Sequence, residues 1–363
     1  MVNVKMRSRA RGAIVGTAIG DALGMPVEGL SPATIVSKFG HLRSMVAPKN
    51  GTWARQTHNL RRGQWTDDTQ LMLAIGESVV SKGFLDFEDI AKRHVLCLND
   101  PRGWGKSTLT GIGRIKAGVS WWNSAAQDGA GNGTPMKIAP LGVLLALGRI
   151  NVFEARTAVI NISRMTHGDP RPAIAGIIQM DAVCKAMKCG VAGLHWLQYS
   201  SAIAESLEFS LGCHHIKEDG LLSTALRKAT IMVGNGNNLS EIRDAIGAKS
   251  FVIESFPFTI AAVLKYRNDP EACLLELAAQ GGDADTTCAM AGALLGAAHG
   301  LSAFPERWRR PLEGYTRLVT LADGLCWQNG LKPCLDGFSE RPHISFSKKS
   351  IQSATDQLPR VLK

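Results

Sequence analysis

The sequence predicts an all-α protein, because helical periodicity runs through most of its length and strand patterns are nearly absent. Apolar residues recur at three- and four-residue steps, as in Leu71, Met72, Ile75 and Val79. Alternating apolar and polar residues rich in β-branched side chains, the pattern of a half-buried strand, hardly occur. The helical spacing predicts eleven helices, over residues 69–80, 84–98, 139–147, 153–165, 171–188, 194–211, 221–233, 254–266, 270–279, 285–299 and 308–322.

Length and composition fit a chain with a large core. The 363 residues are 45% apolar and 20% charged, which argues against disorder over most of the length. No apolar run reaches roughly 18 residues, so we expect no membrane span. A basic N-terminus is followed by no signal-type apolar segment, so we expect the protein to stay in the cytoplasm.

The net charge of +10 leaves three explanations open. Nucleic-acid binding is the least favoured, because Lys and Arg are scattered and no aromatic residues interleave with them. A pyrophosphate-bearing substrate and a generally solvated surface each account for part of the charge. The eight cysteines form no CxxC pair and mostly sit among apolar helical residues, so we expect reduced thiols rather than disulfides or a zinc site.

Three segments interrupt the regular pattern. Residues 40–63 are polar, glycine-rich and basic, and predict a long loop, with 41–62 as an insertion. The 285–299 segment carries Gly292, Gly296 and several alanines, which favours close approach to a neighbouring helix. From 332 to 363 the periodicity is lost, which predicts a partly disordered C-terminal appendage. No linker divides the rest, so we expect a single domain over 1–331.

Two acidic motifs each stand immediately before a predicted helix: WTDDT at 65–69 and GGDADTT at 281–287. Capping of the helix N-terminus is the simple explanation. A cap needs one side chain, however, and each motif supplies two carboxylates and a hydroxyl. Carboxylates gathered this closely repel each other unless a cation lies between them, and oxygen donors select Mg²⁺ or Mn²⁺ over zinc.

A third acidic segment lies near the N-terminus, in GDALGMPVEG at 20–29. Asp21 is interpreted as a structural carboxylate at the end of, or inside, a helix. Glu28 follows a Gly-Met-Pro turn and is therefore expected on a loop, where its carboxylate could swing over a site.

Six pieces of the sequence together resemble the ADP-ribosylglycohydrolase family. They are GAIVGTAIGDALGMPVEG, GQWTDDTQLMLAIGES, GNGTPMKIAPLGVL, MTHGDPRPAIAG, ESFPFTIAAVL and GGDADTTCAMAGALLGAAHG. They occur in the family's order and span roughly residues 11–300. The resemblance implies a single orthogonal multi-helix bundle with two Mg²⁺ or Mn²⁺ ions at the base of a cleft. It places the metal ligands at Thr66, Asp67, Asp68, Asp283, Asp285 and Thr286.

The resemblance also implies roles for residues around the metals. Glu28 matches a loop glutamate that reaches a metal or moves aside as substrate enters, and Glu28, Asp285 or Asp100 would handle protons in catalysis. The substrate-binding positions that it implies are Gly103, Trp104, Gly105, Gly131, Asn132, Gly133 and His167. Without the resemblance, GAGNG at 129–133 reads equally well as an ordinary turn, and a lone histidine at 167 reads as a surface or cap residue.

The implied activity is hydrolysis of the bond between ADP-ribose and arginine in modified proteins, by a protein that we expect to be monomeric. An alternative from another class is an immunity protein that neutralises an ADP-ribosyltransferase toxin, with 41–62 and the tail as contact surfaces. A related nucleosidase or a catalytically silent relative is a third hypothesis. Lys137, where relatives often carry arginine, and the basic insertion are departures that affect substrate choice.

Overall fold

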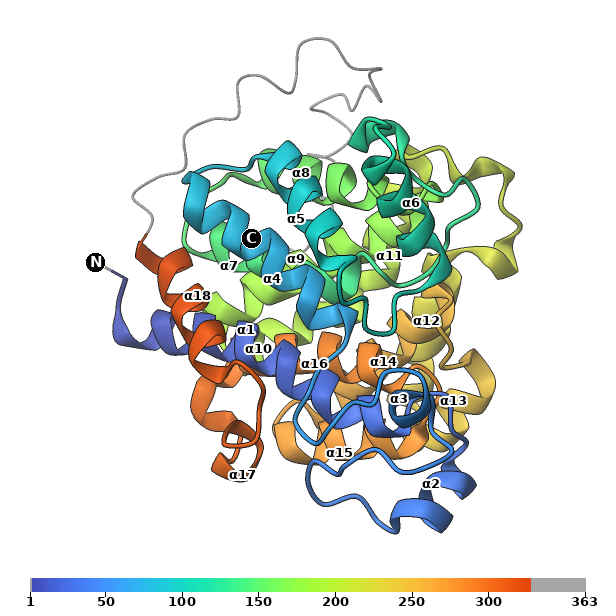
Figure 1. The fold of residues 1–363 in the computed structure, drawn as a ribbon. Coiled ribbons are helices and arrows are strands. Elements are labelled where there is room, and N and C mark those ends of the chain that lie inside the picture. The colour runs from blue at the N-terminus through green and yellow to red at the C-terminus, as the bar shows by residue number, and fades with distance from the viewer. Residues whose placement is uncertain (1, 328–363) are drawn as a thin grey trace.

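In a computed structural model that describes residues 2–327, the chain folds into a bundle of helices with no β-strand in that range (Figure 1). The expectation of an all-α protein is confirmed. The α-helices are α1 (Val4–Gly24), α2 (Pro32–Phe39), α3 (Trp53–Gln56), α4 (Asp67–Lys82), α5 (Phe87–Cys97), α6 (Lys106–Lys116), α7 (Ala139–Ala146), α8 (Val152–Arg164), α9 (Pro170–Cys189), α10 (Val191–Leu194), α11 (Ser200–Ser210), α12 (Leu222–Gly234), α13 (Leu239–Ile246), α14 (Val252–Tyr266), α15 (Pro270–Gln280), α16 (Ala284–His299), α17 (Glu306–Arg309) and α18 (Tyr315–Trp327).

Two of the expected helices are wrong in their extent. The segment 194–211 is a 3₁₀ helix, His195–Tyr199, followed by α11. The segment 308–322 is divided between α17 and α18, with Pro311 in the connection. Proline lacks the backbone N–H that would continue a helix, which accounts for this second break.

The long helix α1 is absent from the expected helices, because burial on all sides removes the amphipathic signal. From Arg9 to Gly24 every residue except Arg11 is buried. A helix without a polar face has no periodic alternation for a sequence to display. The short helices α2, α6 and α13 were also not expected.

Glycines spaced four residues apart bring α1 and α16 into backbone contact. A Cβ built on Gly12, Gly16, Gly20 or Gly24 would lie only 2.0–2.3 Å from a carbonyl oxygen of α16. The facing residues run in the opposite order along α16: Gly296, Gly292, Cys288 and Ala284. Any side chain on α1 at these positions would push the helices apart. The close approach expected for the small residues of α16 is confirmed.

This antiparallel contact positions the site. It sets the C-terminal end of α1, with Asp21 and the following Glu28, beside the N-terminal end of α16, with Asp283 and Asp285 (Figure 1). The N-terminal end of α4 meets the same point, because Asp21 is bonded to it. One hydrophobic core extends around these helices from Ala10 to Cys326.

The remaining expectations concern the insertion, the tail and the thiols. Residues 40–63 are mostly loop, as expected, with α3 as a single helical turn. The expected appendage at 332–363 lies outside the described residues. Each of the seven cysteines between 2 and 327 is a free thiol, and five of them are buried. Over the same range, no helix has the length and hydropathy to traverse a bilayer.

Candidate metal centre

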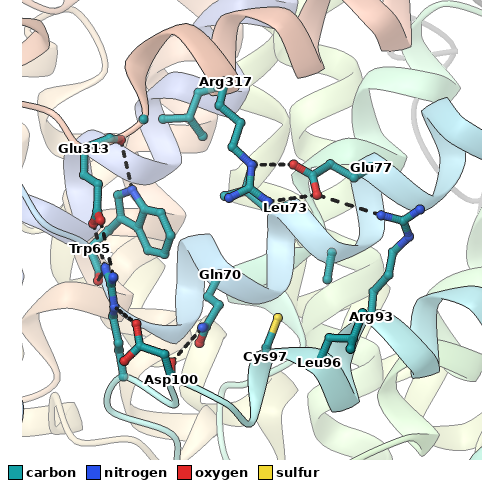
Figure 2. Close-up of a pocket in the computed structure, with 14 residues that line it drawn as sticks. Trp65, Gln70, Leu73, Glu77, Arg93, Leu96, Cys97, Asp100, Glu313 and Arg317 are labelled. Carbon is teal, nitrogen blue, oxygen red and sulfur yellow. Dashed lines mark hydrogen bonds and ion pairs between the residues drawn. The ribbon is translucent and has the colours of Figure 1, made fainter.

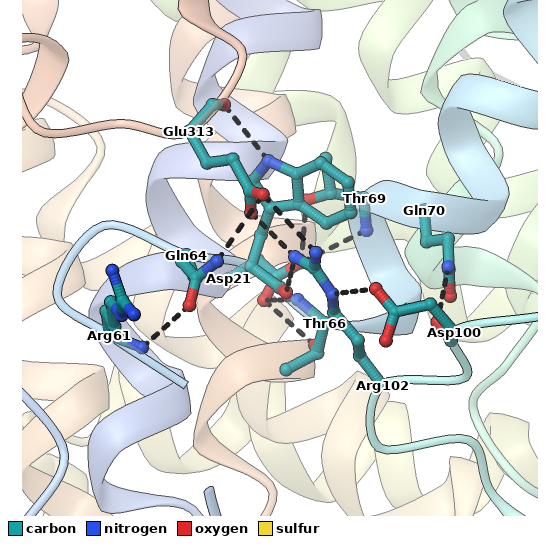
Figure 3. A network of polar contacts seen from close by, with 10 residues as sticks. Asp21, Arg61, Gln64, Thr66, Thr69, Gln70, Asp100, Arg102 and Glu313 are labelled. Carbon is teal, nitrogen blue, oxygen red and sulfur yellow. Dashed lines mark hydrogen bonds and ion pairs between the residues drawn. The ribbon is translucent and has the colours of Figure 1, made fainter. Parts of the chain in front are cut away.

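Asp21 of α1 caps the N-terminus of α4. Its Oδ1 accepts from the Thr66 N–H at 2.8 Å and its Oδ2 from the Thr69 N–H at 3.0 Å (Figure 3). The hydroxyls of both threonines also donate to it, at 2.9 and 2.6 Å. Thr66 holds the N-cap position, yet its own side chain makes no capping bond. Because Asp21 does the capping, the carboxylates of Asp67 and Asp68 are not needed for it.

The Thr66 hydroxyl lies among three carboxylates. Its Oγ1 is 3.1 Å from Asp68 Oδ2 and 3.1 Å from Asp285 Oδ2, in addition to its contact with Asp21. One hydroxyl proton cannot satisfy three acceptors. Oxygens of Asp21, Asp68 and Asp285 all lie within 4.8 Å of one another. The two acidic motifs, more than two hundred residues apart in sequence, therefore converge in space.

A second group of carboxylates shares Asp285 with the first. Oxygens of Glu28, Asp283 and Asp285 also lie within 4.8 Å of one another. Asp283 is the N-cap of α16 but makes no capping bond, and its Oδ2 instead accepts from Asn132 Nδ2 at 2.7 Å. At the N-cap position of both motifs, Thr66 and Asp283, the side chain therefore makes no capping bond. Asp285 Oδ1 accepts from the Thr286 N–H at 2.9 Å, which fixes its orientation.

The glycine pair before Asp283 allows this loop to pack tightly. Gly281 and Gly282 both have positive φ, and a Cβ on them would lie 2.0 and 2.3 Å from the carbonyl oxygens of Leu30 and Ala248. Backbone bonds join Gly282 to the segment just after Glu28, in both directions, at 2.8 and 3.1 Å. The loops that carry Glu28 and Asp283 thus hold each other in place.

Burial and mutual repulsion raise the pKa of every carboxyl group in this cluster. Burial raises the pKa of Asp21 to about 6, although its four hydrogen bonds oppose the shift. Burial, followed by the charges of neighbouring carboxylates, raises the pKa of Glu28, Asp67 and Asp68 well above the usual range. The pKa values of Asp283 and Asp285 are raised as well, again mainly by burial.

The cluster fits a hard divalent cation. Two of its buried oxygens, Glu28 Oε2 and Asp68 Oδ1, have no hydrogen-bond partner. A buried oxygen without a donor is costly, and a cation removes that cost and the repulsion together. The donors are carboxylates and threonine hydroxyls, with no thiolate or imidazole among the grouped ligands of the described chain. This donor set suits Mg²⁺ or Mn²⁺.

A hollow of about 700 Å³ connects the cluster with solvent. Glu28 and Asp283 line its inner end, between the 28–31 loop and the 247–250 loop. Charges of both signs line the rest of it: Lys249, Glu254, and Arg243 paired with Asp244 at 3.1 Å. Asp283, at 9% exposed, is the least buried of the aspartates in the cluster. The hollow is therefore a route by which a ligand can reach this side of the cluster.

The predicted substrate loop 131–133 borders the same region. Asn132 is buried and bonds to Asp283 and to Ser255 Oγ at 3.0 Å. His167 lies beneath the loop: a Cβ on Gly131 or Gly133 would come within 3.3 or 2.6 Å of its ring. The residue-level hypothesis of a surface histidine is wrong, since His167 is 3% exposed and its Nδ1 meets Thr166 Oγ1 at 2.7 Å. Burial lowers the pKa of His167 to about 3.

The loop from Asp100 to Gly105 is only partly joined to the cluster. Gly103 adjoins it, since a Cβ there would lie 3.6 Å from Asp67 Oδ1. Trp104 is packed into the core with its indole N–H bonded to Gln70 at 2.7 Å, and Gly105 begins α6 in open surroundings. These placements do not bring Trp104 or Gly105 to the acidic groups.

Asp100, the expected general base, lies apart from the other carboxylates. Its side chain is 69% exposed and bonds to Arg102 Nε at 2.9 Å, while Arg102 also pairs with Glu313 at 2.6 Å (Figure 3). It faces a separate hollow of about 510 Å³ between α4, α5 and the start of α18 (Figure 2). In that hollow Arg317 pairs with Glu77, so the charges that line the hollow are largely compensated.

Buried Lys137 is a neighbour of the cluster that the sequence did not indicate as such. Its ammonium group is fully buried and its Nζ has no hydrogen-bond partner. Burial lowers its pKa to about 8, while the charge of Asp67 acts in the opposite direction. The one available signal was a lysine directly before the apolar run IAPLGVL. It adds a positive charge beside the carboxylates.

The sequence model of the ADP-ribosylglycohydrolase family matches residues 3–332. The chain belongs to this family. It is 29% identical to the ADP-ribosyl-[dinitrogen reductase] glycohydrolase of Rhodospirillum rubrum, over 86% of this chain and 93% of that protein. It is 26% identical to the ADP-ribosylarginine hydrolase Tri1 of Pseudomonas putida, over 87% of this chain and 77% of the relative. Family membership supports a hydrolase activity.

The fold agrees with the family as well. A solved structure described as an ADP-ribosylglycohydrolase-related protein complex aligns with a TM-score of 0.64 and 28% identity. The alignment covers 89% of this chain and 98% of that one. The bundle is thus of the ADP-ribosylglycohydrolase type, and its acidic residues converge where α1, α4 and α16 meet.

Proposed function

We propose that this protein hydrolyses the N-glycosidic bond between ADP-ribose and arginine in modified proteins, using two Mg²⁺ or Mn²⁺ ions, and so reverses mono-ADP-ribosylation. The observation that carries the proposal is the convergence of five carboxylates from three segments, two of them with buried oxygens that lack partners, with buried Asp67 close enough for their charges to raise its pKa. The five are Asp21, Glu28, Asp68, Asp283 and Asp285. The names of the Rhodospirillum and Pseudomonas relatives support the reaction class and the arginine linkage.

The ions would be held by Thr66, Asp67, Asp68, Asp283, Asp285 and Thr286. When bound, they would hold the ribose hydroxyls and lower the pKa of a water molecule near the anomeric carbon. Asp21 stays outside this ligand set, because all four of its hydrogen bonds go to the start of α4. It acts as a positioning residue that fixes Thr66 and the two aspartates after it.

Glu28 is the residue that we assign to proton transfer. Its Oε2 has no partner, its carboxylate adjoins Asp283 and Asp285, and it lines the hollow that leads to solvent. In hydrolysis, the water oxygen bonds to the anomeric carbon as the carbon–nitrogen bond breaks. One water proton passes to Glu28 Oε2 and from there to the departing nitrogen, so that arginine leaves as the guanidinium and Glu28 returns to its starting state. Asp100, which is exposed and paired with Arg102, gains no support as the base.

The rest of the substrate has a place along the hollow of about 700 Å³. Lys249 on its wall suits the negative charge of the pyrophosphate, and Arg243 beside it also pairs with Asp244. Asn132 ties the 131–133 loop to Asp283, so that this loop and the metal ligands form one unit. Gly131 and Gly133 keep the loop against His167, whose low pKa leaves it neutral at pH 7.

Release of ADP-ribose from arginine-modified protein tests the proposal. We expect activity to need Mg²⁺ or Mn²⁺ and to fall by several orders of magnitude in Asp285→Ala. Asp219→Ala is the matched control, because Asp219 lies in an exposed turn remote in sequence from every motif. Serine-linked and DNA-linked ADP-ribose are assayed in parallel. Undiminished release by Asp285→Ala, or by the wild type in excess chelator, would contradict the metal assignment.

Neutralisation of an ADP-ribosylating toxin stays a prediction that shares the same site. If the protein protects a cell by hydrolysis, Asp285→Ala abolishes protection. If it protects by covering the toxin, that variant still protects. The cytoplasmic location and the monomeric state also stay predictions.

A further inference from the structure

One segment lacks acidic residues and therefore carries +6 of the net charge of +10. From Gly29 to Thr66 the sequence holds six Lys and Arg residues and no Asp or Glu, against a net charge of +10 for the whole chain. The segment comprises α2, α3 and the loops of the insertion. Its basic residues are Lys38, Arg43, Lys49, Arg55, Arg61 and Arg62.

Five of these cations line one hollow, which we call the basic hollow. Its volume is about 740 Å³, and its walls are Lys38, Ala47, Pro48, Lys49, Asn50, Arg55, Leu60, Arg61 and Arg62. No acidic residue lines it. This differs from the hollow beside α18, where Arg317 is paired with Glu77 and Arg102 with Glu313.

The cations of the basic hollow are uncompensated. Within residues 2–327, none of them forms an ion pair, and their side-chain bonds go to neutral oxygens. Lys38 donates to the Asn50 carbonyl at 3.3 Å and Arg55 to Asn59 Oδ1 at 2.6 Å. Arg61 and Arg62 are exposed. Like charges gathered without counter-charges raise the local potential and attract an anionic surface.

The basic hollow is fixed beside the carboxylate cluster. Trp53 of α3 packs on Met25, Ala54 and Leu60, a small apolar cluster separate from the main core. A Cβ on Gly103 would lie 2.9 Å from the Trp53 ring and 3.6 Å from Asp67 Oδ1, so the insertion borders the loop next to the metal ligands. In Figure 1, α2 and α3 lie toward the end of α1 that carries the site. A protein whose modified residue enters the carboxylate cluster would therefore contact the insertion.

We propose that the basic hollow docks an acidic surface of the modified protein while its ADP-ribosylated residue occupies the carboxylate site. The inference rests on the proposed function and names the kind of partner that the site takes. A protein surface fits better than a nucleic acid, because the walls carry no aromatic ring on which a base could stack. The nearby rings are engaged internally: Phe39 with the Lys49 ammonium and Trp53 with His58.

Two peptides test the inference with the full-length, metal-loaded protein. Each carries one ADP-ribosylarginine at its centre, flanked by glutamates in one and by glutamines in the other. The variant combines Arg55→Glu, Arg61→Glu and Arg62→Glu, all at exposed positions. We expect KM for the glutamate peptide to rise about tenfold or more, with kcat within twofold, because charges at the rim of an interface act on association. KM for the glutamine peptide and for free ADP-ribosylarginine stays within twofold.

The matched control reverses three exposed charges elsewhere, with Lys5→Glu, Lys92→Glu and Lys188→Glu. It should leave all three KM values within twofold. A similar KM increase for the glutamine peptide or for ADP-ribosylarginine would overturn the inference, as would an equal effect of the control. Loss of binding to single-stranded DNA without a change for the glutamate peptide would overturn it in favour of nucleic acid.

Binding and turnover are measured separately, so that the two proposals can fail separately. Fluorescence anisotropy reports binding of the labelled glutamate peptide whether or not ADP-ribose is released. If the wild type binds it in a salt-sensitive manner but releases nothing, the proposed function fails and the docking surface stands. If it releases ADP-ribose from both peptides with the same KM, the docking surface fails and the function stands.

Discussion

Replacing Gly20 by alanine tests whether the close contact of α1 and α16 assembles the site. Gly20 faces α16 in the glycine series of α1 and directly precedes Asp21. A Cβ there would lie 2.0 Å from the Cys288 carbonyl oxygen and 2.7 Å from the Ala289 nitrogen. These are backbone atoms in the middle of a helix, so no side-chain rotation relieves the clash.

The magnitude follows from that distance. Restoring a contact of about 3.5 Å requires the helices to part locally by about 1.5 Å. Overpacking of this kind costs about 1–3 kcal/mol, whereas removing a glycine from a helix contributes about 1 kcal/mol of stability. We therefore expect a net loss of up to about 2 kcal/mol. A shift of this size also moves Asp21, and with it Thr66, away from Asp285, and weakens binding of divalent cations.

The assay is urea unfolding with and without Mn²⁺, together with calorimetric titration of the cation. Gly113→Ala is the matched control, because Gly113 lies inside α6 and no atom is within 4 Å of its built Cβ. That variant should gain about 0.5–1 kcal/mol and bind Mn²⁺ unchanged. Equal stability and equal cation affinity of the Gly20 and Gly113 variants would refute the reasoning.

Three further predictions concern charges at and near the cluster. In chelator, the free energy of unfolding should fall as pH rises from about 4 to 7. Burial raises the pKa of carboxyl groups in the folded state, that of Asp21 to about 6, so that the folded protein binds more protons than the unfolded chain. Thermal melts in chelator that show no such fall would contradict the prediction. Lys137→Met should bind Mn²⁺ about tenfold more tightly, since a positive charge beside Asp67 opposes the cation. Weaker Mn²⁺ binding by this variant in calorimetry would contradict that explanation. Asp100→Asn should keep kcat within about twofold, because Asp100 is exposed and paired with Arg102. A hundredfold loss of kcat in the release assay would instead indicate that Asp100 is the general base.

The acidic motifs show which part of the candidate site the local sequence can predict. Two carboxylates and a hydroxyl before a helix, repeated at 65–69 and 281–287, were sufficient to indicate a cation site. The same pattern could not exclude capping, because a cap is a local interaction that any Asp or Thr before a helix can make. The decision came from Asp21, which takes over the capping of α4 from another helix.

Other residues lay beyond the reach of local patterns. Asp100 was expected at the reaction centre, yet the loop turns its side chain toward Arg102 and solvent. In the sequence, Lys137 differs from relatives, but its place beside Asp67 depends on which helices pack around it. Electrostatic neighbours of this kind are set by the packing of distant segments.

The sequence by itself determined the helical class, the family and the chemical type of the cluster, because periodicity, motif order and donor atoms are all written along the chain. Only the tertiary structure decided which carboxylates lie within 4.8 Å of one another, and that Asp21 caps α4 from another helix. The physical reason lies in the helix contact: glycines on one buried helix allow backbone approach to another, and α1 carries no amphipathic signal that would reveal it.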